Sequence, residues 1–262
     1  MTRMPTLFLS HGSPMHAVDP GKAGDLWQGL NAALPKPRAL VIASAHWETA
    51  RPMLTGSAHP DTIHDFGGFP EALYRIRYPA PGAPDVARRA AELLREQGFD
   101  ADIDPSRGLD HGAWVPLLRM FPDADIPVVQ LSIQTELGPG HHLRVGRALQ
   151  PLAADDVLIL ASGHTTHNLR DWMMNRRGGE PLSYAQEFST WLHDALASRE
   201  MEALVAYRER APGAQRAHPT EEHFLPIFIA IGAAGEDATP EPLLRAFEGS
   251  ALAMDSYLFR PR

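Results

Sequence analysis

Two hydrophobic patterns alternate along the chain, and together they predict strands that alternate with helices. Continuously apolar runs, typical of strands buried on both faces of a sheet, occur at residues 5–10, 38–45, 126–133 and 156–163. Segments with apolar residues three and four positions apart predict helices, and these are 22–33, 84–97, 112–120, 139–151, 183–197, 199–207 and 221–232. A further strand is predicted in 99–103, and late strands in 238–260. We therefore expect one catalytic α/β domain over residues 1–262, with a mainly parallel central sheet and helices on both faces.

One long segment, residues 49–82, interrupts this alternation. It is rich in glycine, proline and histidine but also carries Phe66, Phe69, Tyr74 and Tyr78. Connections of this length inside a domain are usually either functional or disordered. The aromatic residues favour an ordered, irregular loop that forms the wall of a pocket.

Composition narrows the classes of function. The 262 residues carry a net charge of −8, which disfavours binding to nucleic acid or to anionic membranes. There is no cysteine, so any metal must be held by nitrogen and oxygen. The chain shows neither a signal peptide nor the run of about 18 apolar residues that a membrane span needs. We expect a cytoplasmic protein.

Histidines recur where apolar strands end. His11 follows the first run, His46 the second, and His164 and His167 the fourth. Parallel strands present their carboxyl ends at one edge of the sheet, where ligands bind in such folds. Because neutral imidazole is a common ligand of zinc and iron, the sequence predicts a metal site at that edge.

Other residues beside these histidines are candidates for supporting roles. His111 lies between Asp110 and a helix start, so a neighbouring carboxylate can raise its basicity, and it is interpreted as an acid/base. His223 stands in "EEHFLP" near a predicted helix start. Trp47 could form a wall of the site, and the Asn168 amide could orient His167 or a substrate. Glu48 and Glu222 adjoin proposed ligands and could be ligands themselves or solvated groups, and the pocket-wall loop leaves His64 undecided. His16, His59, His141, His142, His193 and His218 are expected at the surface or in loops.

Several common catalytic motifs are missing. The sequence contains no G-x-S-x-G elbow, no GxxxxGK[ST] loop and no H-E-x-x-H helix. "HDFGGF" does not open a helix after a strand, so it is not a dinucleotide fingerprint. We therefore favour a metal site whose residues are distant in the sequence and are brought together by the fold.

Six stretches in this order resemble the class III extradiol ring-cleavage dioxygenases, most of all the single-chain 4,5-DOPA-dioxygenase-like branch. They cover nearly the whole chain and are "LFLSHGSPM", "VIASAHW", "TIHDFGGFPEALYRIRYPAPG", "DHGAWVPLLRMFPDADIPVVQLSI", "ILASGHTTHNLR" and "EEHFLPIFIAIGA". The resemblance implies an α/β fold with a non-haem divalent metal. It also implies O2-dependent opening of a catechol ring next to its diol, giving a semialdehyde.

Carried over residue by residue, the resemblance places the metal at His11, His46 and His223. His167 becomes a fourth ligand or the acid/base, and His111 a second pocket histidine. The loop with His64 becomes part of the substrate pocket, where Trp47, Phe66, Phe69 and Trp114 could form the slot for the ring. A small aromatic diol and O2 are thus the expected partners.

The identity of the third ligand bears on the metal. Many class III relatives use two histidines and a glutamate, whereas this chain presents His223 with Glu222 beside it. Fe(II) is expected for activity, and an all-nitrogen set could favour Zn(II) in purified or crystallised protein. Two alternatives stay open: a zinc-dependent hydrolase on a similar scaffold, and a non-catalytic protein that binds metal or a phenol.

Overall fold

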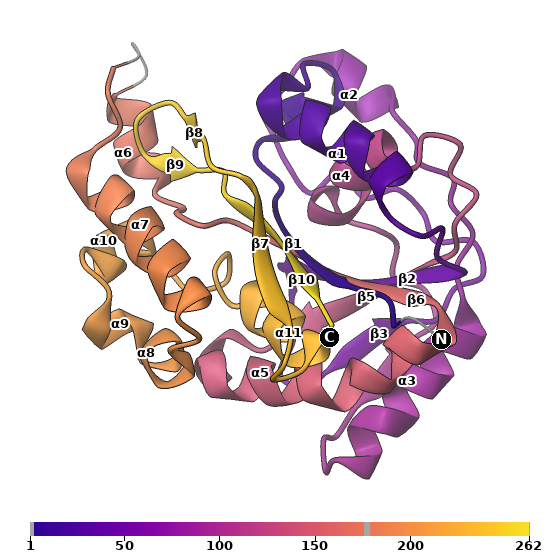
Figure 1. Ribbon diagram of the computed structural model, residues 1–262. Coiled ribbons are helices and arrows are strands. Elements are labelled where there is room, and N and C mark those ends of the chain that lie inside the picture. The colour runs from indigo at the N-terminus through magenta and orange to yellow at the C-terminus, as the bar shows by residue number, and fades with distance from the viewer. Residues whose placement is uncertain (1–2, 176–178, 262) are drawn as a thin grey trace.

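A mixed sheet forms the centre of the molecule in the computed structural model, which describes residues 3–175 and 179–261 (Figure 1). Across the described residues the sheet has eight strands in the order β4-β3-β5-β2-β6-β1-β10-β7. The four inner strands β5, β2, β6 and β1 run parallel, whereas β10 and β7 add antiparallel strands at one edge and β3 pairs antiparallel with β5. The predicted mainly parallel α/β sheet is confirmed. The strands are β1 (Thr6–Ser10), β2 (Ala39–Glu48), β3 (Met53–Thr55), β4 (Asp102–Asp104), β5 (Val128–Ile133), β6 (Val157–Gly163), β7 (Thr239–Leu244) and β10 (Ser256–Arg260), with a separate hairpin of β8 (Phe247–Glu248) and β9 (Leu252–Ala253).

The inner strands are apolar because helices cover them on both faces. Every residue of β1, β5 and β6 is buried. Alternate side chains of a strand point to opposite faces, so Leu40 and Ile42 of β2 pack on one side, while Val41 and Ala43 pack on the other. Two apolar layers therefore lie against one sheet.

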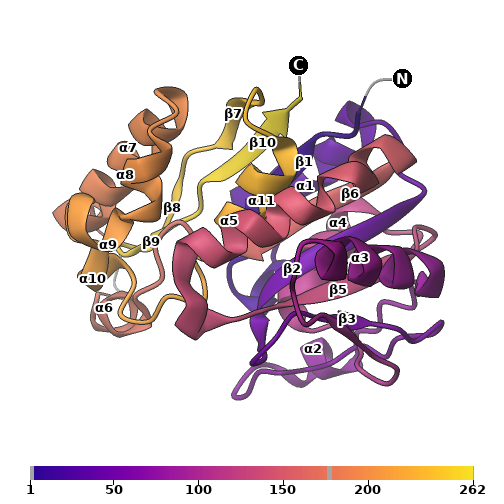
Figure 2. The ribbon, with the colours of Figure 1, turned by 90° about the horizontal axis from the view of Figure 1, so that it is seen from below.

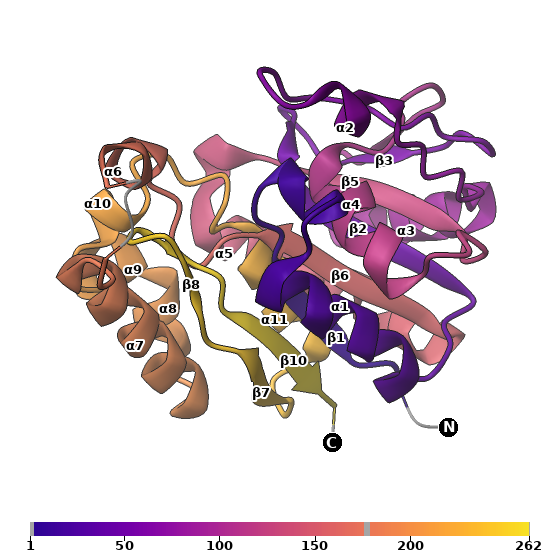
Figure 3. The same cartoon turned by 90° about the horizontal axis from the view of Figure 1, so that it is seen from above.

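Helices α1 and α4 cover one face, seen in Figure 3, and α3, α5 and α11 cover the other, seen in Figure 2. Helix α7 and the short helices after it lie beside the β10 edge (Figure 1). None of the helices in the described ranges is both long and apolar enough to cross a membrane. The α-helices are α1 (Gly21–Ala33), α2 (Glu71–Arg75), α3 (Pro84–Glu96), α4 (His111–Met120), α5 (Gly138–Leu149), α6 (Leu169–Met174), α7 (Ser183–Ala197), α8 (Met201–Val205), α9 (Tyr207–Arg210), α10 (Ala214–Ala217) and α11 (Pro226–Ala234), and the 3-10 turns are η1 (Pro14–Ala17), η2 (Thr135–Leu137) and η3 (Gln150–Asp155).

Helices α5 and α11 touch backbone to backbone at a pair of glycines. A Cβ atom on Gly146 would collide with the carbonyl oxygen of Ile229, and one on Gly232 with that of Leu143. This close approach lets both helices lie on the sheet beneath β6 and β1.

Four predicted boundaries differ from the structure. Strand β2 runs to Glu48, so His46 lies inside the strand and not beyond it. Helix α11 begins at Pro226, and residues 221–225 form turns, because proline fits the first helical turn but not the helix interior. The single helix predicted over 199–207 is two short ones, α8 and α9, and the irregular segment 49–82 contains β3 and α2. The late strands of 238–260 are confirmed.

Candidate metal centre

Three histidines from distant parts of the chain converge at the carboxyl edge of the parallel strands. His11 directly follows β1, His46 lies near the end of β2, and His223 lies in the turn before α11. Their ring centroids are 4.9 Å (His11–His46), 4.9 Å (His46–His223) and 5.4 Å (His11–His223) apart. One nitrogen from each ring lies within 4.8 Å of the other two. This spacing lets three imidazoles face one ion.

The partners of His11 and His223 determine which ring nitrogen carries the proton. The Ser162 hydroxyl donates its single proton to the Gly112 carbonyl, so it can only accept from His11 Nδ1, 2.9 Å away. The Glu222 carboxylate likewise accepts from His223 Nδ1 at 2.9 Å. Both rings therefore keep a lone pair on Nε2.

His46 completes the set of lone pairs. Its Nδ1 lies 3.7 Å from the Asp65 carboxylate, which orients the Nδ1 proton toward Asp65. Its Nε2 lies 3.0 Å from His11 Nε2. When His11 and His46 each carry their proton on Nδ1, their two Nε2 lone pairs face each other at this distance and repel. A cation bound by both Nε2 atoms would remove that repulsion. The buried Nε2 of His223 also has no hydrogen-bond partner among the described residues. The donor set therefore fits a metal ion.

Burial keeps these rings neutral, as metal ligands must be. Loss of solvation holds the pKa of both His11 and His223 well below the usual value, and the neighbouring histidines lower it further. Burial, followed by the charge of His111, lowers the pKa of His46 to about 3. At neutral pH all three side chains have their lone pairs available.

Glycine lets the loop that carries His223 approach the sheet. A Cβ on Gly163, the last residue of β6, would collide with the carbonyl oxygen of His223. The same carbonyl accepts a hydrogen bond of 2.7 Å from the main-chain N–H of His164. The end of β6 thus fixes the main chain of His223 beside the other two histidines.

His111 stands beside this cluster and is oriented by Asp65. Helix α4 starts at His111 because the Asp110 side chain caps it, accepting from Ala113 N–H. Asp65 accepts from both the main-chain N–H (2.9 Å) and Nδ1 (3.0 Å) of His111. His111 Nε2 therefore carries a lone pair, and the ring centroid lies 3.9 Å from that of His46. Burial acts to raise the pKa of Asp65, but the hydrogen bonds from His111 outweigh it and lower the pKa to about 2, so Asp65 is ionised.

His167 and His164 both lie against the His223 ring. The His167 ring stacks on the His223 ring, with centroids 3.5 Å apart and planes inclined by 14°. Burial, followed by the charge of His111, lowers the pKa of His167 to about 4. His164 Nε2 accepts from the Gly12 N–H at 3.0 Å, so His164 anchors the turn that follows His11.

An aromatic group built around Phe66 adjoins His111. The Phe66 ring centroid lies 5.7 Å from that of His111, and it also contacts Phe69 and Tyr74. His64 lies against Phe66 and Trp114, and its Nε2 donates to the Ile76 carbonyl. The loop of residues 49–82 therefore brings aromatic rings to the side of the cluster where His111 stands.

Two residues interpreted as substrate-binding have other contacts. The Asn168 amide caps α6 by accepting from Asp171 N–H and donates to the Arg216 carbonyl, so its polar atoms are already engaged. The Trp47 ring packs under the Arg107 guanidinium, 5.0 Å away. Its ring makes no contact with the histidine cluster among the ring pairs of residues 3–175 and 179–261. We therefore leave Asn168 and Trp47 out of the proposed substrate contacts.

The expectation that the remaining histidines lie at the surface or in loops is wrong for His16, His141 and His142, which are buried in η1 and α5. His218 lies in a loop as expected, but it is buried there. His142, for example, donates to the Gly138 carbonyl and accepts from Gln134 N–H, because a neutral imidazole has one donor and one acceptor for main-chain groups.

Two residues of the site were missed in the sequence. Asp65 orients His111 and faces His46, and Ser162 orients His11. Asp65 follows His64 in a loop without periodicity, and Ser162 is a small polar residue in an apolar run. A hydrogen bond from either of them to a histidine elsewhere in the chain therefore leaves no signal in the local sequence. The "HD" pair in a loop with the character of a pocket wall was the available hint.

Comparison with known proteins finds relatives that match nearly the whole chain. Residues 5–254 match the family model described as the catalytic LigB subunit of aromatic ring-opening dioxygenase. A 4,5-DOPA dioxygenase extradiol of Beta vulgaris is 42% identical over 259 residues, which are 97% of this chain and 96% of that protein. One of Escherichia coli K12 is 42% identical over 235 residues, 88% of this chain and 86% of that protein. The crystal structure of an uncharacterized protein from Escherichia coli K12 superposes with a TM-score of 0.84 at 34% identity, over 98% of this chain and 99% of that one. These matches favour neither the hydrolase nor the non-catalytic alternative.

Proposed function

The chain belongs to the family of the catalytic LigB subunit of aromatic ring-opening dioxygenases and is an extradiol ring-cleaving oxidoreductase, and within that activity we propose that it opens a catechol-type ring with O2 to a semialdehyde at a metal held by His11, His46 and His223. The observation that carries the proposal is the convergence of three neutral imidazoles, each of which offers a ring nitrogen within 4.8 Å of the other two. Three protein ligands leave positions free for a substrate.

Fe(II) is the metal that we propose for activity, with Zn(II) able to occupy the same nitrogen ligands in purified protein. When bound, the ion would supply Lewis acidity toward the two hydroxyl oxygens of the diol. Ser162, Glu222 and Asp65 hold the three ligand rings in the tautomer that coordination needs.

His111 is the base that we propose for the phenolic proton. Its Nε2 lone pair is free to accept, because Nδ1 donates to the ionised Asp65. The carboxylate stabilises the imidazolium that forms, as an orienting carboxylate does in other acid/base pairs. The proton can return from the same atom when the product leaves.

His167 serves as the second acid/base group in this proposal, in preference to a fourth ligand. Its ring plane is almost parallel to that of His223 and stacked on it. Burial lowers its pKa to about 4, so it is neutral at pH 7 and acquires a proton only from a strongly acidic group. It would hold that proton briefly, beside the ring of His223 on which it stacks.

The substrate ring would lie against Phe66, between His111 and the loop that carries His64. Stacked and edge-to-face contacts with an aromatic ring stabilise a flat substrate there. Since two relatives are named 4,5-DOPA dioxygenases, an amino-acid catechol is the first substrate to test.

The experiment is anaerobic loading with Fe(II), followed by DOPA and a panel of other catechols under air. Oxygen uptake at one O2 per ring opened, with a yellow semialdehyde product, is the expected result. Iron-loaded protein that consumes no oxygen with any catechol of the panel refutes the proposal. Activity with zinc and without oxygen would instead indicate hydrolysis.

A further inference from the structure

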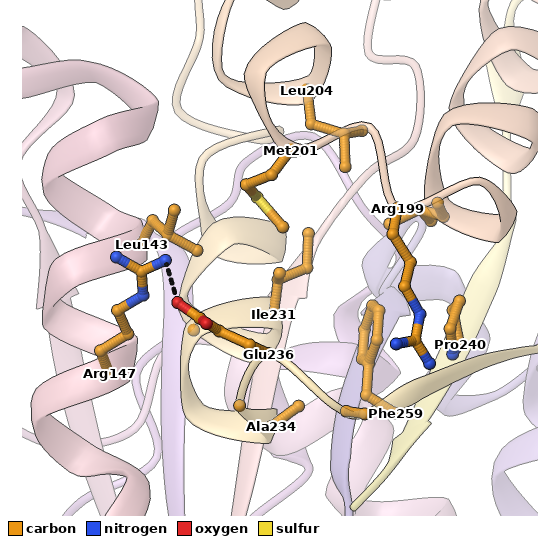
Figure 4. Close-up of a pocket in the computed structure, with 14 residues that line it drawn as sticks. Leu143, Arg147, Arg199, Met201, Leu204, Ile231, Ala234, Glu236, Pro240 and Phe259 are labelled. Carbon is orange, nitrogen blue, oxygen red and sulfur yellow. Dashed lines mark hydrogen bonds and ion pairs between the residues drawn. The ribbon is translucent and has the colours of Figure 1, made fainter.

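A second cavity lies away from the histidines, between α5, α8, α11 and the end of β10 (Figure 4). Its volume is about 220 Å³. Phe259, which lines it, pairs with Thr6 at the start of β1, whereas His11 follows the end of that strand. A strand of five residues spans about 16 Å, so the cavity and the metal centre stand at opposite ends of β1.

The floor of this cavity is apolar. Leu143, Ile231 and Phe259 line it, with Met201 and Leu204 from α8 above them in Figure 4. The volume is below the range of about 300–1,000 Å³ that drug-sized ligands occupy. The cavity therefore suits a short apolar chain or a single ring.

Charge at the rim is positive. Arg147 pairs with Glu236 at 3.1 Å, which neutralises both, while Arg199 forms no ion pair with another residue of 3–175 or 179–261. The closest acceptor of the Arg199 guanidinium is the Asp237 carbonyl, at a long 3.4 Å. In Figure 4 this guanidinium lies beside Phe259 and Pro240, at the opposite side of the cavity from the Arg147–Glu236 pair.

The backbone of Arg199 adopts a conformation that disfavours residues with a Cβ atom. Arg199 has φ +57° and follows the end of α7, where its N–H bonds the Leu196 carbonyl and the Glu200 N–H bonds the Ala195 carbonyl. Glycine is the usual residue at this position of a helix end, because a Cβ atom disfavours positive φ. An arginine here works against backbone preference and at the same time places a cation at the cavity.

We propose that this cavity is a second binding site, for a small carboxylate with an apolar tail. The tail would pack against Ile231 and Phe259, and the carboxylate would accept a charge-assisted, bidentate pair of hydrogen bonds from Arg199. The net charge of the lining residues, +1 at neutral pH, favours a monoanion over a neutral or cationic ligand.

Isothermal titration of the metal-loaded enzyme with octanoate tests the site, with 1-octanol as the neutral probe of equal chain length. One saturable octanoate site is expected in the wild type. Arg199→Gly should weaken octanoate by at least tenfold and leave 1-octanol unchanged. Its melting temperature should equal or exceed that of the wild type, since glycine suits the backbone. Met201→Trp, which fills the cavity from above, should weaken both probes.

Three results overturn the proposal. The first is a wild type that shows no saturation with octanoate, and the second is an Arg199→Gly variant that binds octanoate as tightly as the wild type. The third is octanoate binding that His111→Ala removes and Arg199→Gly preserves, which would locate the probe at the metal centre.

Discussion

Asp65→Asn is the substitution that separates the proposed base from the proposed ligands most sharply. It keeps the shape of the side chain but replaces one acceptor oxygen by an NH2 donor. Asp65 accepts two hydrogen bonds from His111, one at the main-chain N–H and one at Nδ1. With an amide, either a donor faces a donor, or the ring moves its proton to Nε2 and loses the lone pair that accepts the phenolic proton.

The lowered pKa of Asp65 gives the magnitude. Burial raises this pKa, but the hydrogen bonds from His111 lower it from 3.8 to about 2. At 1.36 kcal/mol per pKa unit, this favours the ionised form by about 2 kcal/mol, within the range of about 1.5–3 kcal/mol for hydrogen bonds to charged groups. Because the folded-state pKa is lowered, the stabilisation is present above pH 3.8 and is lost as pH falls through 2. At pH 7, Asn lacks all of it, and because the carboxylate would also stabilise the imidazolium that forms when His111 takes the proton, a loss of similar size in the transition state lowers turnover by about tenfold to about 150-fold.

Oxygen uptake by the iron-loaded variant measures the turnover, and elemental analysis measures the metal. Asp65→Asn should keep most of its metal, because it touches the ligand set only through the 3.7 Å approach to His46. Asp104→Asn is the matched control, since that carboxylate also accepts main-chain hydrogen bonds, from Ser106 and Arg107, but contacts no histidine. Asp65→Asn protein with wild-type turnover and wild-type metal content would show that His111 is not oriented by Asp65 in any way that matters to the reaction.

Four further substitutions test other parts of the site and fold. His11→Ala should abolish metal retention, while His111→Ala should keep the metal and lower turnover by about 10²–10⁴-fold; equal metal content and unchanged turnover in both would remove the site assignment. Gly163→Ala should push away the main chain of His223 and weaken metal affinity more than tenfold in a competition titration against a chelator, and unaltered affinity would contradict the contact. Burial lowers the pKa of His142 to about 4, so the unfolded chain takes up this proton first as pH falls below 6.5, and at pH 5 the loss of stability from this residue is about 2 kcal/mol. Urea unfolding at pH 7 and pH 5 should show that His142→Gln lacks this part of the loss, and identical losses in both proteins would refute it.

The sequence predicted the sheet, and the edge at which His11 and His46 lie, because both follow from patterns that repeat, whereas His223 entered the predicted ligand set only through the family resemblance. The apolar runs of β1, β2, β5 and β6 predicted buried strands, and the histidines at their ends predicted one edge. Strand β2 extends three residues beyond the predicted end, since Glu48 and Thr49 still pair with Ile133 of β5 through the main chain, which leaves no apolar pattern in the sequence.

What the sequence could not predict are pairings made across the chain. Asp65 and His111 are 46 residues apart, and nothing in either segment records the other. The burial of His142 was missed for the same reason, because its acceptor and donor are main-chain groups that every residue has. The capping role of Asn168 is a local signal, an asparagine just before a helix, but α6 was not predicted and Asn168 was interpreted as orienting His167 or a substrate.

The position of β1 in the sheet has a consequence for how the protein matures. This strand, which leads into His11, lies between β6 and β10, so both of its neighbours are synthesised long after it. A nascent chain emerging from the ribosome carries an apolar strand with two open edges until β6 has appeared, and with one open edge until residue 256 and beyond have appeared. Pairing of such distant segments is slow, and protection of that strand by a chaperone during translation would govern how much active enzyme a cell obtains.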